Sequence, residues 1–244
     1  MKDKKINSEK IVNHIVHWLK TYAENAKVKG FVVGISGGID SALVSTLCAK
    51  TGLPTLCVEM PIHQAPSQVS RGQEHIQFLK DSCKNVTNTV ADLTATFDLM
   101  ANVMPKTDNL PVLNLTLANT RARLRMTTLY YFAGINGYLV AGTGNKVEDF
   151  GVGFFTKYGD GGVDLSPIAD LMKSEVRALA AYLGITQNII TAKPTDGLFG
   201  DDRSDEDQLG ANYDELEFAM NAFDAGKTEV DFTGRELEVF KIYK

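Results

Sequence analysis

The chain alternates short apolar segments rich in β-branched residues with longer segments that have the periodicity of helices. The apolar segments occupy 30–36, 53–60, 85–90 and 137–143, and the helix-like segments around them occupy 7–27, 40–50, 69–82 and 116–133. Strands separated in this way by helices form right-handed βαβ units. We therefore expect an α/β fold with a doubly wound, mostly parallel sheet flanked by helices. Two more helices are expected near 213–224 and 233–241.

Composition narrows the class of protein. The length of 244 residues predicts a single domain over 1–244, and a net charge of −5 argues against a broad nucleic-acid-binding face. Three cysteines without a CxxC pair argue against a zinc site or a disulfide framework and fit a reducing cytoplasm. The N-terminus has no signal-peptide core, and no apolar segment approaches the roughly 20 residues that span a bilayer. We expect a cytoplasmic protein with neither nucleic acid nor membrane as partner.

The segment "FVVGISGGIDSALVS" (31–45) runs from an apolar strand through two adjacent glycines into a helix. This arrangement gathers backbone N–H groups at a helix N-terminus, where they bind phosphate, and the glycines let the ligand approach the backbone closely. The spacing is neither GxGxxG nor GxxxxGK[ST], which excludes the dinucleotide fingerprint and the Walker loop. The alternative is a plain turn in which Ser36 or Asp40 only caps the helix.

Other segments carry more local expectations. The segment 193–210 holds six acids, three glycines and a proline, and we expect a mobile loop that closes over a ligand. Phe154 and Phe155 are expected in the core. Arg121 and Arg125 are two residues to either side of Arg123 and should point to other helix faces, toward solvent or another subunit. The buried face of the first helix is expected to comprise Ile11, Ile15, Trp18, Leu19 and Tyr22.

The loop "SGGIDS" resembles the SGGxDS loop of the ATP pyrophosphatase (PP-loop) superfamily. The segment 142–175, above all "FFTKYGDGG", resembles the matching part of ammonia-dependent NAD synthetases. The resemblance continues through "ARLRM" (122–126), "KPTDGL" (193–198) and "SDEDQLG" (204–210). It implies a Rossmann-like fold of the adenine nucleotide alpha-hydrolase type. It also implies a reaction in which ATP adenylates the nicotinate carboxylate of deamido-NAD (nicotinic acid adenine dinucleotide) and ammonia displaces AMP to give NAD.

The same resemblance implies roles for individual residues. Asp40 and Glu148 would hold Mg²⁺; one extra residue between Glu148 and Gly153 leaves Asp149 as an alternative ligand. Catalytic roles would fall to Asp40, to Lys173, which would stabilise charge at the α-phosphate, and to Asp160, which would accept a proton from the attacking amine or only shape its turn. The ATP contacts would be Gly34, Ile35, Ser36, Gly37, Gly38, Ile39, Asp40, Ser41, Thr143, Lys173 and Thr195. The deamido-NAD contacts would be Arg123, Lys157 and Asp164.

The resemblance also concerns partners and leaves alternatives open. It implies a homodimer with deamido-NAD near the interface, beside the arginine-bearing helix. The chain has no room for a glutamine-hydrolysing domain, so free ammonia or ammonia from another protein is expected. Family members usually continue into a tail with a His-Lys pair, whereas this sequence stops at "VFKIYK" (239–244). Two alternatives remain: another PP-loop amide ligase, or a nucleotide-binding homologue impaired by the missing tail.

Overall fold

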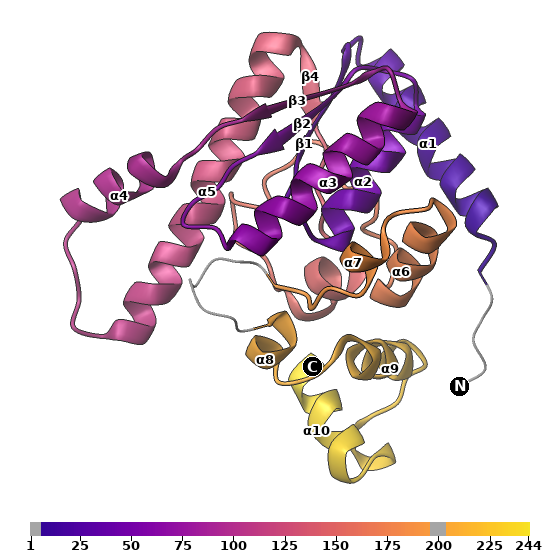
Figure 1. The fold of residues 1–244 in the computed structure, drawn as a ribbon. Helices are drawn as coiled ribbons and strands as arrows, with labels where there is room; N and C mark the ends of the chain where they lie inside the picture. The colour runs from indigo at the N-terminus through magenta and orange to yellow at the C-terminus, as the bar shows by residue number, and fades with distance from the viewer. Residues whose placement is uncertain (1–5, 196–203) are drawn as a thin grey trace.

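The computed structural model describes residues 6–195 and 204–244, and its centre is a parallel sheet in the order β3-β2-β1-β4 (Figure 1). Val32 pairs with Leu56 on one side and Val140 on the other. The strands are β1 (Gly30–Gly34), β2 (Thr55–Glu59), β3 (Val86–Val90) and β4 (Tyr138–Val140). All pairings are parallel, so the predicted α/β class is confirmed.

The helices follow the strands along the chain, with most of them close to the predicted positions. They are α1 (Ser8–Asn25), α2 (Ile39–Lys50), α3 (Pro66–Ser82), α4 (Thr94–Val103), α5 (Leu110–Asn136), α6 (Lys173–Tyr182), α7 (Gln187–Ile190), α8 (Asp205–Leu209), α9 (Tyr213–Asp224) and α10 (Gly234–Tyr243). A π-helical segment η1 (Val147–Val152) and a 3-10 segment η2 (Glu229–Asp231) complete the set. No helix within the described residues is long and apolar enough to cross a membrane.

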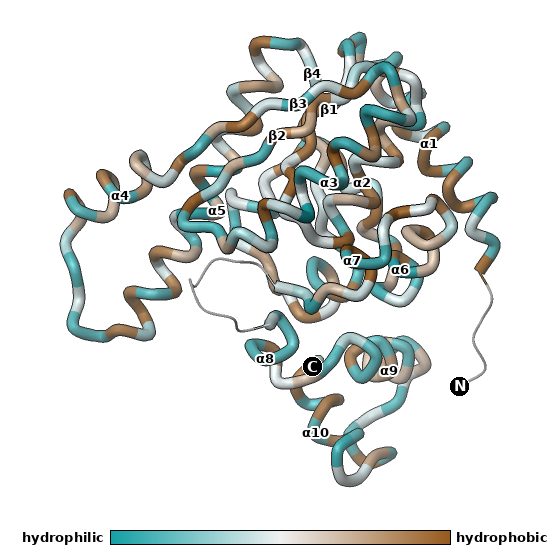
Figure 2. Tube along the Cα trace, viewed as in Figure 1, coloured by the Kyte–Doolittle hydropathy of each residue, from teal (hydrophilic) through white to brown (hydrophobic). Residues whose placement is uncertain are grey.

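The sheet separates two apolar clusters because successive side chains of a strand point to opposite faces. Phe31 and Val33 of β1 join the cluster formed with α1, α2, α3 and α6. Val32 and Val58 point to the other face, where Ala133 of α5 packs against them. Figure 2 shows β1 and β2 as mainly hydrophobic strands between these layers, whereas β3 is partly polar. The carboxyl ends of β1 and β2 are thereby held firmly where a ligand site is expected.

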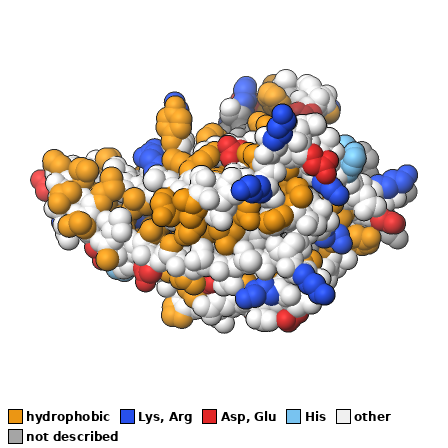
Figure 3. All heavy atoms as spheres, turned by 90° about the horizontal axis from the view of Figure 1, so that it is seen from above, with side chains coloured by type: hydrophobic (Ala, Val, Ile, Leu, Met, Phe, Trp, Pro, Cys, Tyr) orange, Lys and Arg blue, Asp and Glu red, His pale blue; other side chains and the backbone are white. Residues whose placement is uncertain are grey.

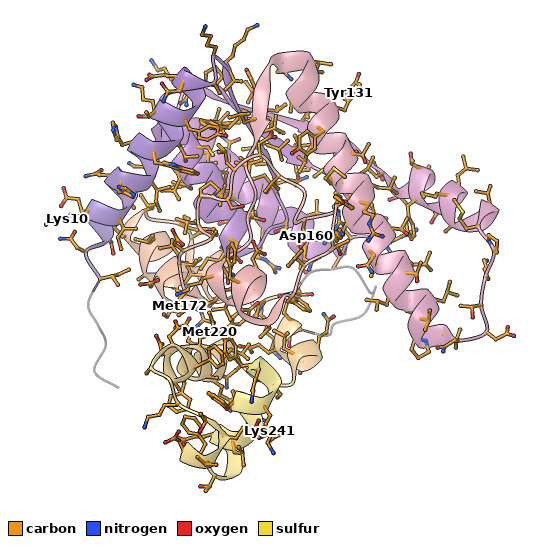
Figure 4. All side chains as sticks on the ribbon, turned by 180° about the vertical axis from the view of Figure 1, so that it is seen from behind. Lys10, Tyr131, Asp160, Met172, Met220 and Lys241 are labelled. Carbon is orange, nitrogen blue, oxygen red and sulfur yellow. The ribbon has the colours of Figure 1, made fainter. Side chains whose placement is uncertain are left out.

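The last helices form an apolar cluster of their own beside the sheet. Tyr213, Leu216 and Met220 of α9 pack with Phe240 of α10 and with Val147 of η1. Met172 and Met220 lie at the junction between this cluster and the rest of the molecule (Figure 4). The C-terminal helices therefore reach the sheet through η1 and the start of α6.

Several expectations about individual segments are wrong. The buried face of α1 consists of Val12, Ile15, Leu19 and Ala23, whereas Trp18 and Tyr22 are exposed. Trp18 and Tyr22 each precede a buried residue by one position, so they lie at the margin of this face and not at its centre. Phe155 is exposed rather than in the core. Helices α4 and α6 were not foreseen. Part of the expected loop 193–210 is α8, capped by Ser204, and residues 196–203 lie outside the described part of the chain.

Candidate active site

The glycine loop after β1 has a conformation that only glycine permits at Gly37. Its φ is +80°, and an added Cβ would overlap the carbonyl oxygen of Gln68 in α3. The two serines brace the loop: Ser41 Oγ donates to Gly38 O at 3.0 Å, and Gly38 N donates to Ser36 Oγ at 3.2 Å. No side chain caps α2, so its first-turn N–H groups are not consumed by Ser36 or Asp40. The capping alternative is therefore wrong, and the first-turn N–H groups of α2 remain free of side-chain caps, as a site for an anion requires.

A buried lysine joins the loop to two other segments. Lys173, the first residue of α6, is 3% exposed, and its Nζ lies 2.6 Å from Asp40 Oδ2 and 3.0 Å from Glu148 Oε1. Burial opposes the charge on Lys173, but the two carboxylates outweigh burial and raise its pKa. Asn145 Nδ2 donates to the other oxygen of Asp40 at 3.1 Å. Three residues predicted from the sequence thus meet in one hydrogen-bonded cluster.

Tyr213 completes this cluster and was not predicted. Its hydroxyl donates to Glu148 Oε1 at 2.6 Å, and its ring centroid lies 4.6 Å from Lys173 Nζ. Burial opposes ionisation of Glu148, yet Lys173 and the Tyr213 hydroxyl outweigh it and hold the pKa of Glu148 below its ordinary value. The pKa of Tyr213 is raised by burial and by the neighbouring acids, so the phenol stays a donor.

A cleft of about 290 Å³ opens at the carboxyl ends of β1 and β2, beside the loop. The predicted residues that line it are Gly34, Ile35, Ser36, Asp40, Ser41, Thr143, Glu148, Asp160 and Thr195. A smaller hollow of about 80 Å³ next to the loop is lined by Gly38 and Ile39, by two acids, Asp40 and Asp205, and by four cations, Arg71, Lys173, Arg177 and Lys193. Arg71 Nε also donates to Gly37 O at 3.1 Å. Cationic side chains therefore lie beside the loop, although Lys173 is paired with Asp40 and Glu148.

Two acids of the cleft lining, Asp149 and Asp160, have raised pKa values. Burial, together with Glu148, Asp160 and Asp40, raises the pKa of Asp149 to about 6. Burial also raises the pKa of Asp160, while its Oδ1 accepts a hydrogen bond of 2.9 Å from Thr156 N. Asp160 therefore shapes its turn, and it also lines the cleft beside α5 (Figure 4).

The expectation for Arg125 is wrong, because its side chain lies in the cleft rather than at the surface. Its Nε donates to Met60 O at 3.1 Å and its Nη2 to Gln64 Oε1 at 2.7 Å, so it fixes the segment between β2 and α3. Glu59, a buried acid at the end of β2, lines the same part of the cleft. Partners more than 60 positions apart in sequence could not be inferred from local spacing.

The three residues expected to contact deamido-NAD do not line the cleft. Arg123 Nε donates to the backbone oxygen of Lys157 at 3.1 Å, which places these two side by side on the outer face of α5. Asp164 accepts from Val140 N at 2.8 Å and from Tyr130 Oη at 3.1 Å. Asp164 thus supports the edge of β4, whereas Arg123 and Lys157 form an outer group that does not line the cleft.

The acids near the loop suit a hard cation. Within the described residues no cluster of three or more potential protein ligands is present. Mg²⁺ is commonly held by only one or two carboxylates together with phosphate oxygens and water. Asp40 and Glu148 supply carboxylates beside the glycine loop, so the donor set fits a magnesium ion that arrives with a nucleotide.

Known proteins resemble the chain over nearly its full length. The family model for NAD synthase matches residues 11–243. The NH₃-dependent NAD⁺ synthetase of Carboxydothermus hydrogenoformans is 36% identical over 95% of this chain and 93% of its own. That of Mesoplasma florum is 41% identical over 84% of this chain and 82% of its own.

Solved structures agree with these matches. An NMN synthetase from Francisella tularensis superposes with a TM-score of 0.83 at 31% identity, covering 98% of this chain and 93% of that one. An NH₃-dependent NAD synthetase from Campylobacter jejuni superposes with a TM-score of 0.77 at 26% identity, covering 97% and 92%. Both matches extend through the loop, the cleft and the C-terminal helices. The chain therefore belongs to the NH₃-dependent NAD⁺ synthetase family.

Proposed function

We propose that the protein amidates deamido-NAD with ammonia at the expense of ATP. The observation that carries the proposal is the Asp40–Lys173–Glu148 cluster at the phosphate-binding loop, in a chain of this family. In the first step a carboxylate oxygen of deamido-NAD attacks the α-phosphorus of ATP and pyrophosphate leaves. In the second, ammonia adds to the acyl carbon of the adenylate, loses a proton, and AMP leaves as the amide forms.

The residues of the cleft would divide this chemistry among them. The N–H groups of the loop and the cations of the small hollow would bind the departing pyrophosphate, and Thr143 and Thr195 would contact ATP. Lys173 would offset the negative charge that develops at the α-phosphate. Asp40 and Glu148 would hold Mg²⁺, with Asp149 as the alternative ligand; the ion would offset phosphate charge. Asp160, whose pKa is raised, would accept the proton that ammonia loses.

We also propose that the protein acts as a homodimer formed through α4 and α5. Exposed apolar side chains gather on this side of the molecule (Figure 3): Leu99, Met100, Val103, Met104, Leu110, Val112, Leu115, Tyr131 and Ile135. An apolar surface of this extent is typical of a protein interface. Arg123 and Lys157 lie on the same helix or beside it, so a dimer would bring them near a second subunit, where deamido-NAD would bind.

A second substrate is favoured by one comparison. The Francisella tularensis relative, with which this chain superposes over 98% of its length, is an NMN synthetase. The carboxylate acceptor would then be nicotinate mononucleotide, which carries the same reacting group without the adenylate half. The loop, Lys173 and the acids would act in the same way on either acceptor.

A single assay with several arms tests the proposed reaction and its two proposed substrates. The protein, ATP and Mg²⁺ are incubated with deamido-NAD or nicotinate mononucleotide and with ammonium or glutamine, and AMP and the amide are measured by mass spectrometry. We expect AMP and NAD with deamido-NAD and ammonium, and little product with glutamine. A higher kcat/KM for the mononucleotide would establish the second substrate. If AMP forms with neither acceptor, both proposed substrates are refuted. That outcome would favour a different carboxylate substrate or a protein that binds nucleotide without turnover.

A further inference from the structure

Tyr213 is the one fully buried tyrosine within the described residues, and it touches both charged partners at the reaction centre. It starts α9, and its ring packs in the C-terminal apolar cluster. A phenylalanine would satisfy that packing equally well. The hydroxyl costs free energy to bury unless it is hydrogen-bonded, and it donates to the carboxylate of Glu148 at 2.6 Å. The position therefore has a feature that packing does not require.

Tyr213 and Lys173 contact the same carboxylate oxygen of Glu148. Tyr213 Oη and Lys173 Nζ both donate to Glu148 Oε1, at 2.6 and 3.0 Å. The face of the tyrosine ring meanwhile lies under the ammonium, where the ring quadrupole attracts a cation. One side chain thus fixes the orientation of Glu148 through its hydroxyl and the position of Lys173 through its ring.

The backbone of Tyr213 links this cluster to α8. Tyr213 N donates to Glu206 Oε1 at 3.1 Å, and the adjacent Asp205 lines both the cleft and the small hollow. The phenol and the backbone of one residue therefore connect the acids at the loop with the helix that borders the site. The Tyr213 hydroxyl thus joins Glu148 to the C-terminal cluster.

We propose that Tyr213 is a positioning residue that holds Glu148 and Lys173 in the arrangement needed for metal and nucleotide binding. The proposal rests on the assignment of Glu148 as a magnesium ligand in the proposed function. Groups that orient a metal ligand through a hydrogen bond generally contribute 10- to 100-fold to metal affinity or activity. Tyr213 is thus expected to act through Glu148 without touching substrate.

The test is metal affinity rather than turnover. Mn²⁺ is titrated into the full chain with a non-hydrolysable ATP analogue, and free Mn²⁺ is followed by electron paramagnetic resonance. We expect Tyr213→Phe to raise the Kd for Mn²⁺ about tenfold, with far-ultraviolet circular dichroism unchanged. Tyr243→Phe is the matched control: Tyr243 packs against the same C-terminal cluster and meets the Phe223 ring edge to face, so the Kd of this variant should match the wild type.

A double-mutant cycle separates positioning from packing. If Tyr213 acts through Glu148, Tyr213→Phe should have no further effect on Mn²⁺ affinity in a Glu148→Gln background. An unchanged Kd in Tyr213→Phe, or an equal effect in both backgrounds, would overturn the proposal. If Tyr213→Phe does not fold, Tyr213 is replaced by 3-fluorotyrosine, which nearly keeps the side-chain volume and alters the strength of the phenol hydroxyl as a hydrogen-bond donor. A shift of at least twofold in the Kd for Mn²⁺ is then expected, and an unchanged Kd would overturn the proposal. None of these readouts needs an acceptor, so failure of the proposed reaction would be seen separately.

Discussion

Gly37 is the loop residue whose replacement is most restricted by its neighbours. Its φ of +80° is costly for any residue with a Cβ, about 1–2 kcal/mol, and the added Cβ would also overlap Gln68 O. Gly52 has nearly the same φ, +78°, with nothing within 4 Å of an added Cβ. Gly37→Ala should therefore lower the melting temperature more than Gly52→Ala and cut pyrophosphate release at least tenfold. Equal effects of the two variants in calorimetry and in the assay would contradict this reading of the loop.

Arg123 offers a test of the outer group. Loss of a hydrogen bond to a charged group is worth about 1.5–3 kcal/mol, so Arg123→Ala should raise the KM for deamido-NAD roughly ten- to a hundredfold and leave the KM for ATP unchanged. Arg121→Ala, two residues earlier on the same helix and stacked on Phe97, is the control and should change neither KM. Steady-state kinetics with each substrate varied in turn measure both. An unchanged KM for deamido-NAD in Arg123→Ala would exclude the contact.

At this scale the sequence predicted those site residues that belong to short, ordered motifs. Asp40, Glu148 and Lys173 meet as the resemblance implied, although they come from three separate segments. Arg125 and Tyr213 escaped prediction because their roles depend on partners that only the folded chain brings near: Met60 for the arginine and Glu148 for the tyrosine. A residue's type and local spacing carry no information about such partners.

Helix α4 was missed for a reason that bears on its function. Its apolar residues Leu99 and Val103 are each 68% exposed, so the helix does not show the buried stripe by which amphipathic helices are recognised. The strands and α2 could be predicted because their apolar residues are covered within this one chain. A helix whose apolar residues are exposed in the single chain does not show the pattern of apolar and polar residues that indicates a buried face.

The homodimer predicts a specific behaviour of α4. Leu99 and Val103 are four residues apart and therefore share a face, so Leu99→Glu with Val103→Glu would place two charges in the proposed interface. We expect sedimentation velocity to show a dimer for the wild type and a monomer for this double variant, with a raised KM for deamido-NAD. Val230→Glu is the control, at an exposed apolar residue on η2 far along the chain. A monomeric wild type, or a double variant that stays dimeric, would refute the interface.

For the molecule as a whole, the pH dependence of folding should report a histidine beneath the loop. His75 of α3 is 1% exposed, and its Nε2 lies 2.9 Å from Ser45 Oγ of α2. Burial lowers its pKa to about 4, from 6.5 in the unfolded chain. The pair joins the two helices that flank the glycine loop, so protonation of His75 would act against the packing that supports the site.

The sign of the effect follows from proton linkage. Between pH 6.5 and about 4 the unfolded chain binds a proton at His75 that the folded chain refuses, so the free energy of unfolding falls as the pH falls through this window. The total loss is about 3 kcal/mol, from a shift of roughly 2.5 pKa units at 1.36 kcal/mol each. Above pH 6.5 both states are neutral and His75 adds no pH dependence.

Asp149 opposes this trend, since its raised pKa of about 6 makes the folded chain bind a proton more tightly than the unfolded one between about pH 4 and 6. The contribution of His75 must therefore be isolated by difference. Urea unfolding of His75→Gln should show a smaller loss of stability between pH 7 and pH 5 than the wild type, because glutamine does not titrate. If the curves of stability against pH for the wild type and His75→Gln were parallel, His75 would be protonated as readily in the folded chain as in the unfolded chain.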